Sequence, residues 1–147
     1  MMGGIFSPYL LAPLCAWLLA QLLKLILGRG QPRKIDLQRL YLSGGMPSAH
    51  TAVVVSLATA TGLTQGLGSV EFGIALILAL IVIYDAMNVR YIVGEQGTLI
   101  TKLLTNHPDL KGVKAPKIIR GHTLGEVFGG VVLGVLVACL ILFAQNP

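Results

Sequence analysis

The sequence predicts an all-α fold, a polytopic membrane helical bundle of about four transmembrane helices plus a short interfacial helix. Hydrophobic residues make up 54% of the 147 residues and charged residues only 12%, which is too apolar for an ordinary soluble domain. About four stretches reach the roughly 20 apolar residues that a helix needs to cross a bilayer. No linker, low-complexity tract or internal repeat interrupts the chain, so we expect one transmembrane domain over residues 1–147.

The first transmembrane helix is expected from Ile5 to Leu27. The chain shows neither the basic start nor the small-residue cleavage site of a secretory signal, so we expect this helix to be retained. Gln21 and Lys24 interrupt its apolar end and share one face. Such polar residues usually face the bundle interior and mark function, although a lysine can also extend to the membrane interface.

The second helix is expected from Pro47 to about Leu63, directly after a pair of glycines. Proline is favoured at the first helical position, because its missing N–H would have no partner there. The free N–H groups of the next turn and the helix dipole would form an anion site, beside which the imidazole of His50 could transfer protons. The alternative is a tight loop into a membrane helix, with His50 at the level of the lipid headgroups.

The third helix is expected from Val70 to Tyr91 and is uniformly apolar until its last residues. Asp85 stands at the membrane edge, where an acidic side chain is costly unless it is paired or hydrated. We therefore expect Asp85 to pair with Arg90 or Lys24, or to support a histidine.

A long loop, Ile92 to Gly121, is expected to follow. Within it, Glu95 to Asn106 carries leucine and isoleucine at helical spacing, which predicts the short interfacial helix, and Pro108 should end that helix. Beyond it lies a basic cluster that is either part of the site or a solvated loop: Lys111, Lys114, Lys117 and Arg120.

The last helix is expected from Gly121 to Phe143. His122 and Glu126 are four residues apart at its start, so their side chains share one face.

The net charge of +5 is concentrated in the first and third loops. This distribution favours a membrane face that acts on an anionic substrate, rather than a nucleic-acid partner. With four spans the two loops lie on one side, which the positive-inside rule predicts to be cytoplasmic. Polar residues from all four helices would then meet at one membrane face: Lys24, Ser48, His50, Asp85, Arg90, His122 and Glu126.

This set of side chains suits phosphoryl transfer. Cations and backbone N–H groups can hold the phosphoryl oxygens, one histidine can attack phosphorus, and the other can protonate the leaving alcohol. A zinc site is the competing interpretation, with His50, His122, Glu126 and Asp85 as ligands, but the neighbouring cations oppose a metal ion. The two cysteines lie in apolar spans without metal-site spacing, and we assign them no chemistry.

Two segments resemble motifs of a known superfamily. The run Pro47-Ser48-Ala49-His50 resembles the Pro-Ser-Gly-His signature of the type 2 phosphatidic acid phosphatase and vanadium haloperoxidase superfamily. The segment from His122 through Glu126 to Gly130 is similar to its third motif. The whole chain, including Gly44-Gly45-Met46 and Tyr84-Asp85-Ala86, most resembles the divergent branch of small integral membrane proteins.

The resemblance implies roles for individual residues. His122 would be the nucleophile that forms a phosphohistidine, Glu126 would orient it, and His50 would be the general acid. No metal or other cofactor would be required. The residues expected to bind the substrate are Lys24, Ser48, Ala49, Asp85 and Arg90.

The chain departs from the superfamily pattern at four places. Gln31-Pro32 stands where the first motif has Arg-Pro, which leaves Arg29 or Arg33 as displaced candidates. Pro116 stands at the arginine of the third motif, whose part Arg90 would take, with Arg120 or Lys117 as substitutes. Ala49 replaces glycine, and Glu126 replaces aspartate.

The expected function is a membrane phosphatase for a lipid phosphate or diphosphate, such as an isoprenyl or glycerolipid one. The alternative is a catalytically weak or inactive scaffold or regulator that binds an anionic lipid or a partner protein. The expected partners are the bilayer and the lipid substrate and not nucleic acid, and a homo-oligomer stays open.

Overall fold

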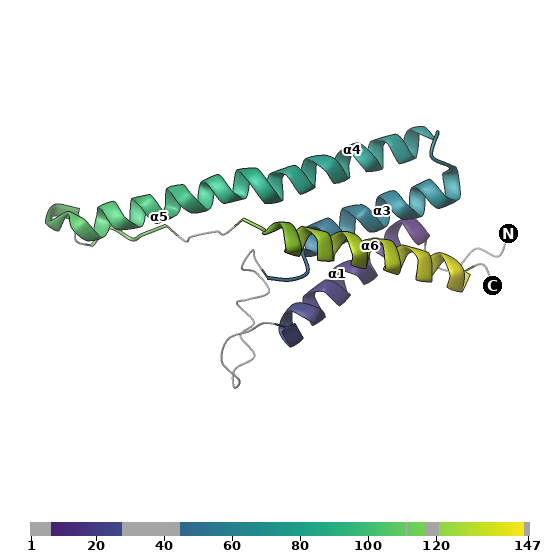
Figure 1. Ribbon diagram of the computed structural model, residues 1–147, viewed down its shortest axis with the longest axis horizontal. Helices are drawn as coiled ribbons and strands as arrows, with labels where there is room; N and C mark the ends of the chain where they lie inside the picture. The colour runs from purple at the N-terminus through teal and green to yellow at the C-terminus, as the bar shows by residue number, and fades with distance from the viewer. Residues whose placement is uncertain (1–6, 28–44, 111, 117–120, 146–147) are drawn as a thin grey trace.

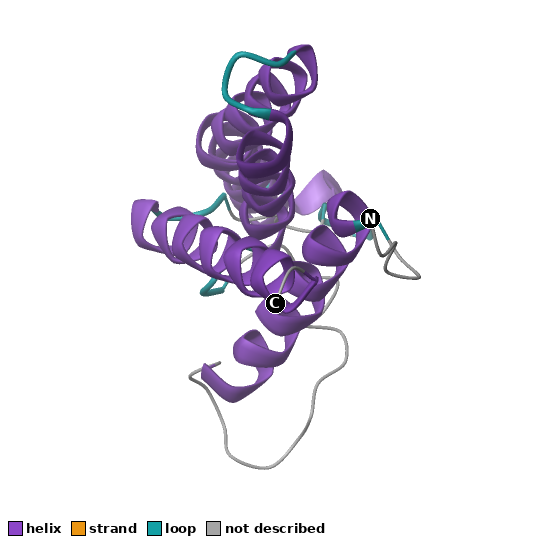
Figure 2. Ribbon diagram, turned by 90° about the vertical axis from the view of Figure 1, so that its right-hand side faces the viewer, coloured by secondary structure: helices purple, strands orange, loops and turns teal. Residues whose placement is uncertain are grey.

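The computed structural model describes residues 7–27, 45–110, 112–116 and 121–145. Within these ranges the chain is helical and contains no β-strand, as Figure 2 shows, so the predicted all-α class is confirmed. The helices are α1 (Pro8–Leu27), α3 (Ala49–Gln65), α4 (Val70–Tyr84), α5 (Arg90–Asn106) and α6 (Leu124–Gln145). A π-helical turn, η1 (Asp85–Val89), and a 3₁₀ turn, η2 (Pro108–Leu110), complete the described elements (Figure 1).

Three segments of the described chain are helical, long and apolar enough to cross a membrane: Pro8–Ile26, Val70–Asn106 and Leu124–Gln145. The shorter α3 lies among them and packs against α1, α4 and α6. Its small residues are the most buried of the bundle, whereas many large apolar side chains of the other helices are exposed, as expected of a surface that meets lipid. The fold is therefore a helical membrane bundle with α3 at its centre.

Small residues let α6 and α3 touch at the backbone. A Cβ atom added to Gly130 would lie 2.6 Å from the carbonyl oxygen of Ser48, and one added to Gly134 would lie 2.7 Å from that of Ala52. Because lipid chains are as apolar as leucine, such close packing is a main source of helix association in membranes. It also sets the start of α6 beside the start of α3, where the polar residues lie.

The third helix does not end at Tyr91, and the long loop does not begin at Ile92. Instead α4, η1 and α5 form one continuous helix, Val70–Asn106, which extends past the start of α6 in Figure 1. No proline interrupts this stretch, and at the π turn the N–H of Arg90 donates to the carbonyl oxygen of Asp85, so the ladder continues. The predicted interfacial helix, Glu95 to Asn106, is the greater part of α5, and it ends before Pro108 as expected.

The second helix begins later than predicted. Pro47 precedes it, and Ser48 is the N-cap, with extended backbone and a side chain that accepts a hydrogen bond from the N–H of Thr51 at 3.4 Å. A serine in this place satisfies a donor that the helix leaves without a partner, which proline cannot do. The last helix likewise starts at Leu124 rather than Gly121, because Thr123 caps it.

Candidate functional site

The end of α1, the start of α3, the π turn and the start of α6 meet at one end of the bundle. A Cβ added to Gly45 would lie 3.9 Å from the Cγ of Lys24, and the N–H of Gly45 donates to Glu126. The N–H of His122 donates to the carbonyl oxygen of Ala86 at 3.0 Å. Segments far apart in the sequence therefore form one polar cluster at this end.

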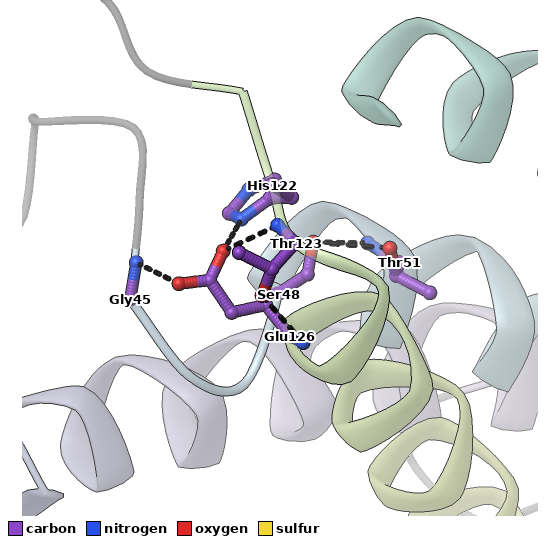
Figure 3. Close-up of polar contacts among 6 residues, drawn as sticks. All are labelled: Gly45, Ser48, Thr51, His122, Thr123 and Glu126. Atoms are coloured by element: carbon purple, nitrogen blue, oxygen red, sulfur yellow. Dashed lines mark hydrogen bonds and ion pairs between the residues drawn. The ribbon is translucent and has the colours of Figure 1, made fainter. Parts of the chain in front are cut away.

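The carboxylate of Glu126 is the centre of this cluster (Figure 3). Its Oε2 lies 2.9 Å from Nδ1 of His122 and accepts the N–H of Thr123 at 3.0 Å, while Oε1 accepts the N–H of Gly45 at 3.1 Å. The N–H of Glu126 donates in turn to the hydroxyl of Thr123 at 3.3 Å, which completes a capping box at the start of α6. Glu126 thus caps the helix and orients the histidine with the same carboxylate.

The pairing with Glu126 determines which nitrogen of His122 is available. An ionised carboxylate only accepts hydrogen bonds, so in the neutral imidazole Nδ1 carries the proton and Nε2 keeps its lone pair. The imidazole is only 1% exposed, and Nε2 is buried without a hydrogen-bond partner among the described residues. A buried polar atom without a partner costs about 1–3 kcal/mol, so its presence here points to a functional reason.

The backbone before His122 is held against the π turn. A Cβ added to Gly121 would lie 2.6 Å from the backbone nitrogen of Tyr91 and 2.8 Å from its Cα. Only glycine allows this approach, which brings the N–H of His122 to Ala86. The sequence predicted no contact between Gly121 or His122 and the π turn, and the glycine directly before the histidine was the one available signal.

The π turn also pairs Asp85 with Arg90. Nε of Arg90 lies 2.9 Å from Oδ2 of Asp85. In an α-helix, residues five apart point about 140° away from each other, whereas the wider π turn brings them to one face. Of the three partners considered for Asp85, the structure shows Arg90, whose terminal guanidinium nitrogens have no partner among the described residues.

His50 and Lys24 complete the cluster. His50 lies exposed on the first turn of α3. Lys24, Arg90 and His122 are near enough to act on it electrostatically, as is Asp85. Lys24 is half-buried and interacts in the same way with Glu126. The formal charges of Lys24 and Arg90 balance those of Asp85 and Glu126, but both carboxylates already accept hydrogen bonds, whereas the terminal guanidinium nitrogens of Arg90 have no partner among the described residues and suit an anionic ligand.

Ser48 and Ala49 do not expose their side chains. The hydroxyl of Ser48 is fully buried and accepts from the N–H of Thr51 and from its hydroxyl, the latter at 3.0 Å. The N–H of Ser48 donates to the carbonyl oxygen of Glu126 at 2.9 Å. Ala49 is 2% exposed and packs in the apolar core with Ala16 and Ala20. In this arrangement the two residues join α3 to α6 and the core.

A polar pocket of about 760 Å³ opens between α5 and residues 121–123. His122 and Thr123 form one wall. The other wall carries Lys102 and the pair Tyr91–Glu95, in which the tyrosine hydroxyl donates to the carboxylate at 3.1 Å. This pocket therefore reaches the histidine from the side of α5.

Other candidates from the sequence lie outside the described residues: Arg29, Arg33, Lys117 and Arg120. Among the residues that the structure describes, no three His, Cys, Asp or Glu side chains gather closely enough to hold a metal ion.

Comparisons with known proteins agree with the motifs. A family model described as "Divergent PAP2 family" matches residues 6–137. The "Uncharacterized membrane protein YuiD" of Bacillus subtilis (strain 168) is 33% identical over an alignment of 147 positions that covers 91% of this chain and 93% of the relative. No solved structure matches the chain significantly.

Proposed function

Because the chain belongs to the Divergent PAP2 family, we propose that it is a membrane phosphatase that hydrolyses a lipid phosphate or diphosphate through a phosphohistidine. The observation that carries this proposal is the His122–Glu126 pair, which selects the neutral tautomer with a lone pair on Nε2, an atom without a partner among the described residues. The cations nearby, Lys24 and Arg90, would neutralise the phosphate.

In the first step, Nε2 of His122 attacks phosphorus, and the bond from phosphorus to the leaving oxygen breaks. Protonated His50 donates its proton to that oxygen, which leaves as the lipid alcohol, or as a lipid phosphate when the substrate is a diphosphate. The charge that appears on the imidazole is balanced by Glu126, 2.9 Å from Nδ1. The free guanidinium nitrogens of Arg90, which Asp85 holds by Nε, would bind the phosphoryl oxygens.

In the second step, a water molecule from the polar pocket attacks the phosphohistidine. Neutral His50 takes the proton of this water, the bond from phosphorus to Nε2 breaks, and inorganic phosphate leaves. The pocket beside His122 would supply the water and release the product. Both steps balance without a metal ion.

One observation favours the alternative, a scaffold or regulator that binds an anionic lipid or a partner protein. Nε2 of His122 is buried in this structure, so a substrate reaches it only after a local opening. A protein that binds the anion at Lys24 and Arg90 without turnover would not need this opening.

We also propose that the site faces the cytoplasm. The support is the positive charge in the loops at that end of the bundle, such as Lys114. Labelling of a Lys114→Cys variant from either side of sealed vesicles tests this orientation, and labelling only from the outside of right-side-out vesicles contradicts it.

The activity is tested by phosphate release from a panel of lipid phosphates and diphosphates in detergent. We expect release by the purified protein, a loss of at least about 10³-fold in His122→Ala, and no effect of a chelator. The Cys139→Ser variant is the control, because Cys139 is exposed on α6 away from the site, and it should keep full activity. No release from any lipid, or equal release by His122→Ala, contradicts the proposal.

A further inference from the structure

A groove lies on the membrane side of the polar cluster, between α4 and α6. Both helices pack against α3 but make few contacts with each other, which leaves space over α3. The groove has a volume of about 400 Å³. Its floor includes Val55 and Thr59 of α3, and its walls include Leu76 and Ile83 of α4 and Val131 of α6.

One end of the groove lies directly below the site. Val55 follows His50 by five residues, Ile83 precedes Asp85 by two, and Val131 follows Glu126 by five. At the rise of an α-helix, these separations are about 3–8 Å along the helix axes. A ligand in the groove would therefore have one end next to the charged residues.

The other end is closed by an aromatic ring. Gly62 is buried in α3, and a Cβ added to it would lie 2.9 Å from the ring of Phe72 and 3.1 Å from Leu67. Phe72 therefore packs onto the bare backbone of α3 and blocks the groove there. From Phe72 to Ile83 the groove is about 16 Å long.

We propose that this groove binds a hydrocarbon chain of an anionic lipid whose headgroup lies at the site, and that Phe72 limits the length of the chain. The inference rests on the proposed function for the identity of the headgroup. Charge supports this occupant, because the end of the groove at Ile83 leads along the same helix to the Asp85–Arg90 pair, while the lining residues are apolar except for Thr59. Since a lipid chain is already in an apolar medium outside the groove, binding there gives length selectivity through packing more than affinity.

Fluorescence quenching measures binding without turnover. The one tryptophan, Trp17, is replaced by phenylalanine, and a reporter is introduced as Phe72→Trp at the closed end. The control is Phe143→Trp, because Phe143 is 77% exposed near the end of α6 and does not line the groove. The probe is an alkyl phosphonate with a brominated chain end, added to each variant in an unbrominated detergent.

We expect saturable quenching of at least about twofold at position 72, reversed by an excess of the unbrominated phosphonate, and only weak, non-saturable quenching at position 143. Two results overturn the proposal that the groove binds the chain. One is equal quenching at the two positions, and the other is quenching at position 72 that the competitor does not reverse.

Chain-length preference supplies the second measurement. With alkyl phosphates of increasing length, Phe72→Ala should shift the optimum of phosphate release to longer chains by several-fold in kcat/KM, whereas Phe143→Ala should not. Reversible quenching without phosphate release supports the groove and contradicts the proposed phosphatase. Phosphate release with an unchanged chain-length optimum in Phe72→Ala overturns the proposal that the groove binds the chain, but it does not contradict the proposed phosphatase activity.

Discussion

Replacing Glu126 by glutamine separates the two roles of this residue. The amide keeps the size of the side chain and one oxygen that can accept the N–H of Thr123 or Gly45, but it loses the negative charge 2.9 Å from Nδ1 of His122. If the amide nitrogen faces the imidazole, it donates to Nδ1, so the proton moves to Nε2 and the lone pair needed for attack disappears. Comparable losses of an orienting carboxylate lower kcat by on the order of 10⁴-fold in serine proteases.

We therefore expect Glu126→Gln to lower kcat by about 10²–10⁴-fold with little change in KM, because the phosphate contacts come from other residues. Stability should fall by only about 1.5–3 kcal/mol, the value of one hydrogen bond to a charged group. The assay combines steady-state phosphate release with thermal unfolding of the purified protein in detergent.

Thr123→Ala is the matched control for this prediction. It removes the hydroxyl that accepts the N–H of Glu126 at 3.3 Å but leaves the His122–Glu126 pair in place. It should cost about 1 kcal/mol of stability, as other N-cap losses do, and keep most of the activity. The reasoning is refuted if Glu126→Gln keeps the wild-type kcat, or if both variants lose activity in proportion to their loss of stability.

Three further variants test the surroundings of the site. Gly121→Ala places a Cβ 2.6 Å from the backbone nitrogen of Tyr91, so it should lower stability by about 1–3 kcal/mol and also lower kcat, as unfolding and phosphate release would measure. Asp85→Asn frees Arg90 from a partly exposed ion pair, and it should raise KM several-fold in initial-rate assays while changing stability by less than about 1 kcal/mol. Gly134→Ala puts a Cβ 2.7 Å from the carbonyl oxygen of Ala52 and should lower the unfolding temperature in detergent more than Gly125→Ala, whose Cβ would meet nothing within 4 Å.

The apolar helices and the His122–Glu126 pair could be predicted because both depend on local spacing. A run of apolar residues forms a membrane helix whatever its neighbours are, and residues four apart share one face of any α-helix. The sequence also predicted that these polar residues gather at one end of the bundle, because each of them lies near the end of an apolar span. The ion pair of Asp85 and Arg90 could be predicted only in part. The sequence left Arg90 as one of several possible partners of Asp85, and the π turn brings these two side chains together.

The predicted starts of α3 and α6 were too early, because they were set at Pro47 and Gly121 and not after the N-cap residues. Ser48 and Thr123 determine where these helices begin, since each side chain accepts a backbone N–H that the first turn leaves without a partner. The end of the third helix was misplaced because Asp85 and Arg90 resemble a membrane boundary, although nothing in Asp85–Val89 breaks the helix.

By itself, the sequence determined a helical membrane protein with two histidines, a carboxylate and several cations at one end of its helices. Only the tertiary structure decided that Gly121 holds His122 against the π turn, that the hydroxyl of Ser48 is occupied, and that a groove closed by Phe72 runs below the site. The reason is physical. Helix periodicity acts over a few residues, whereas these features depend on how closely the backbones of α3, α4 and α6 approach one another, and that depends on packing between residues far apart in the chain.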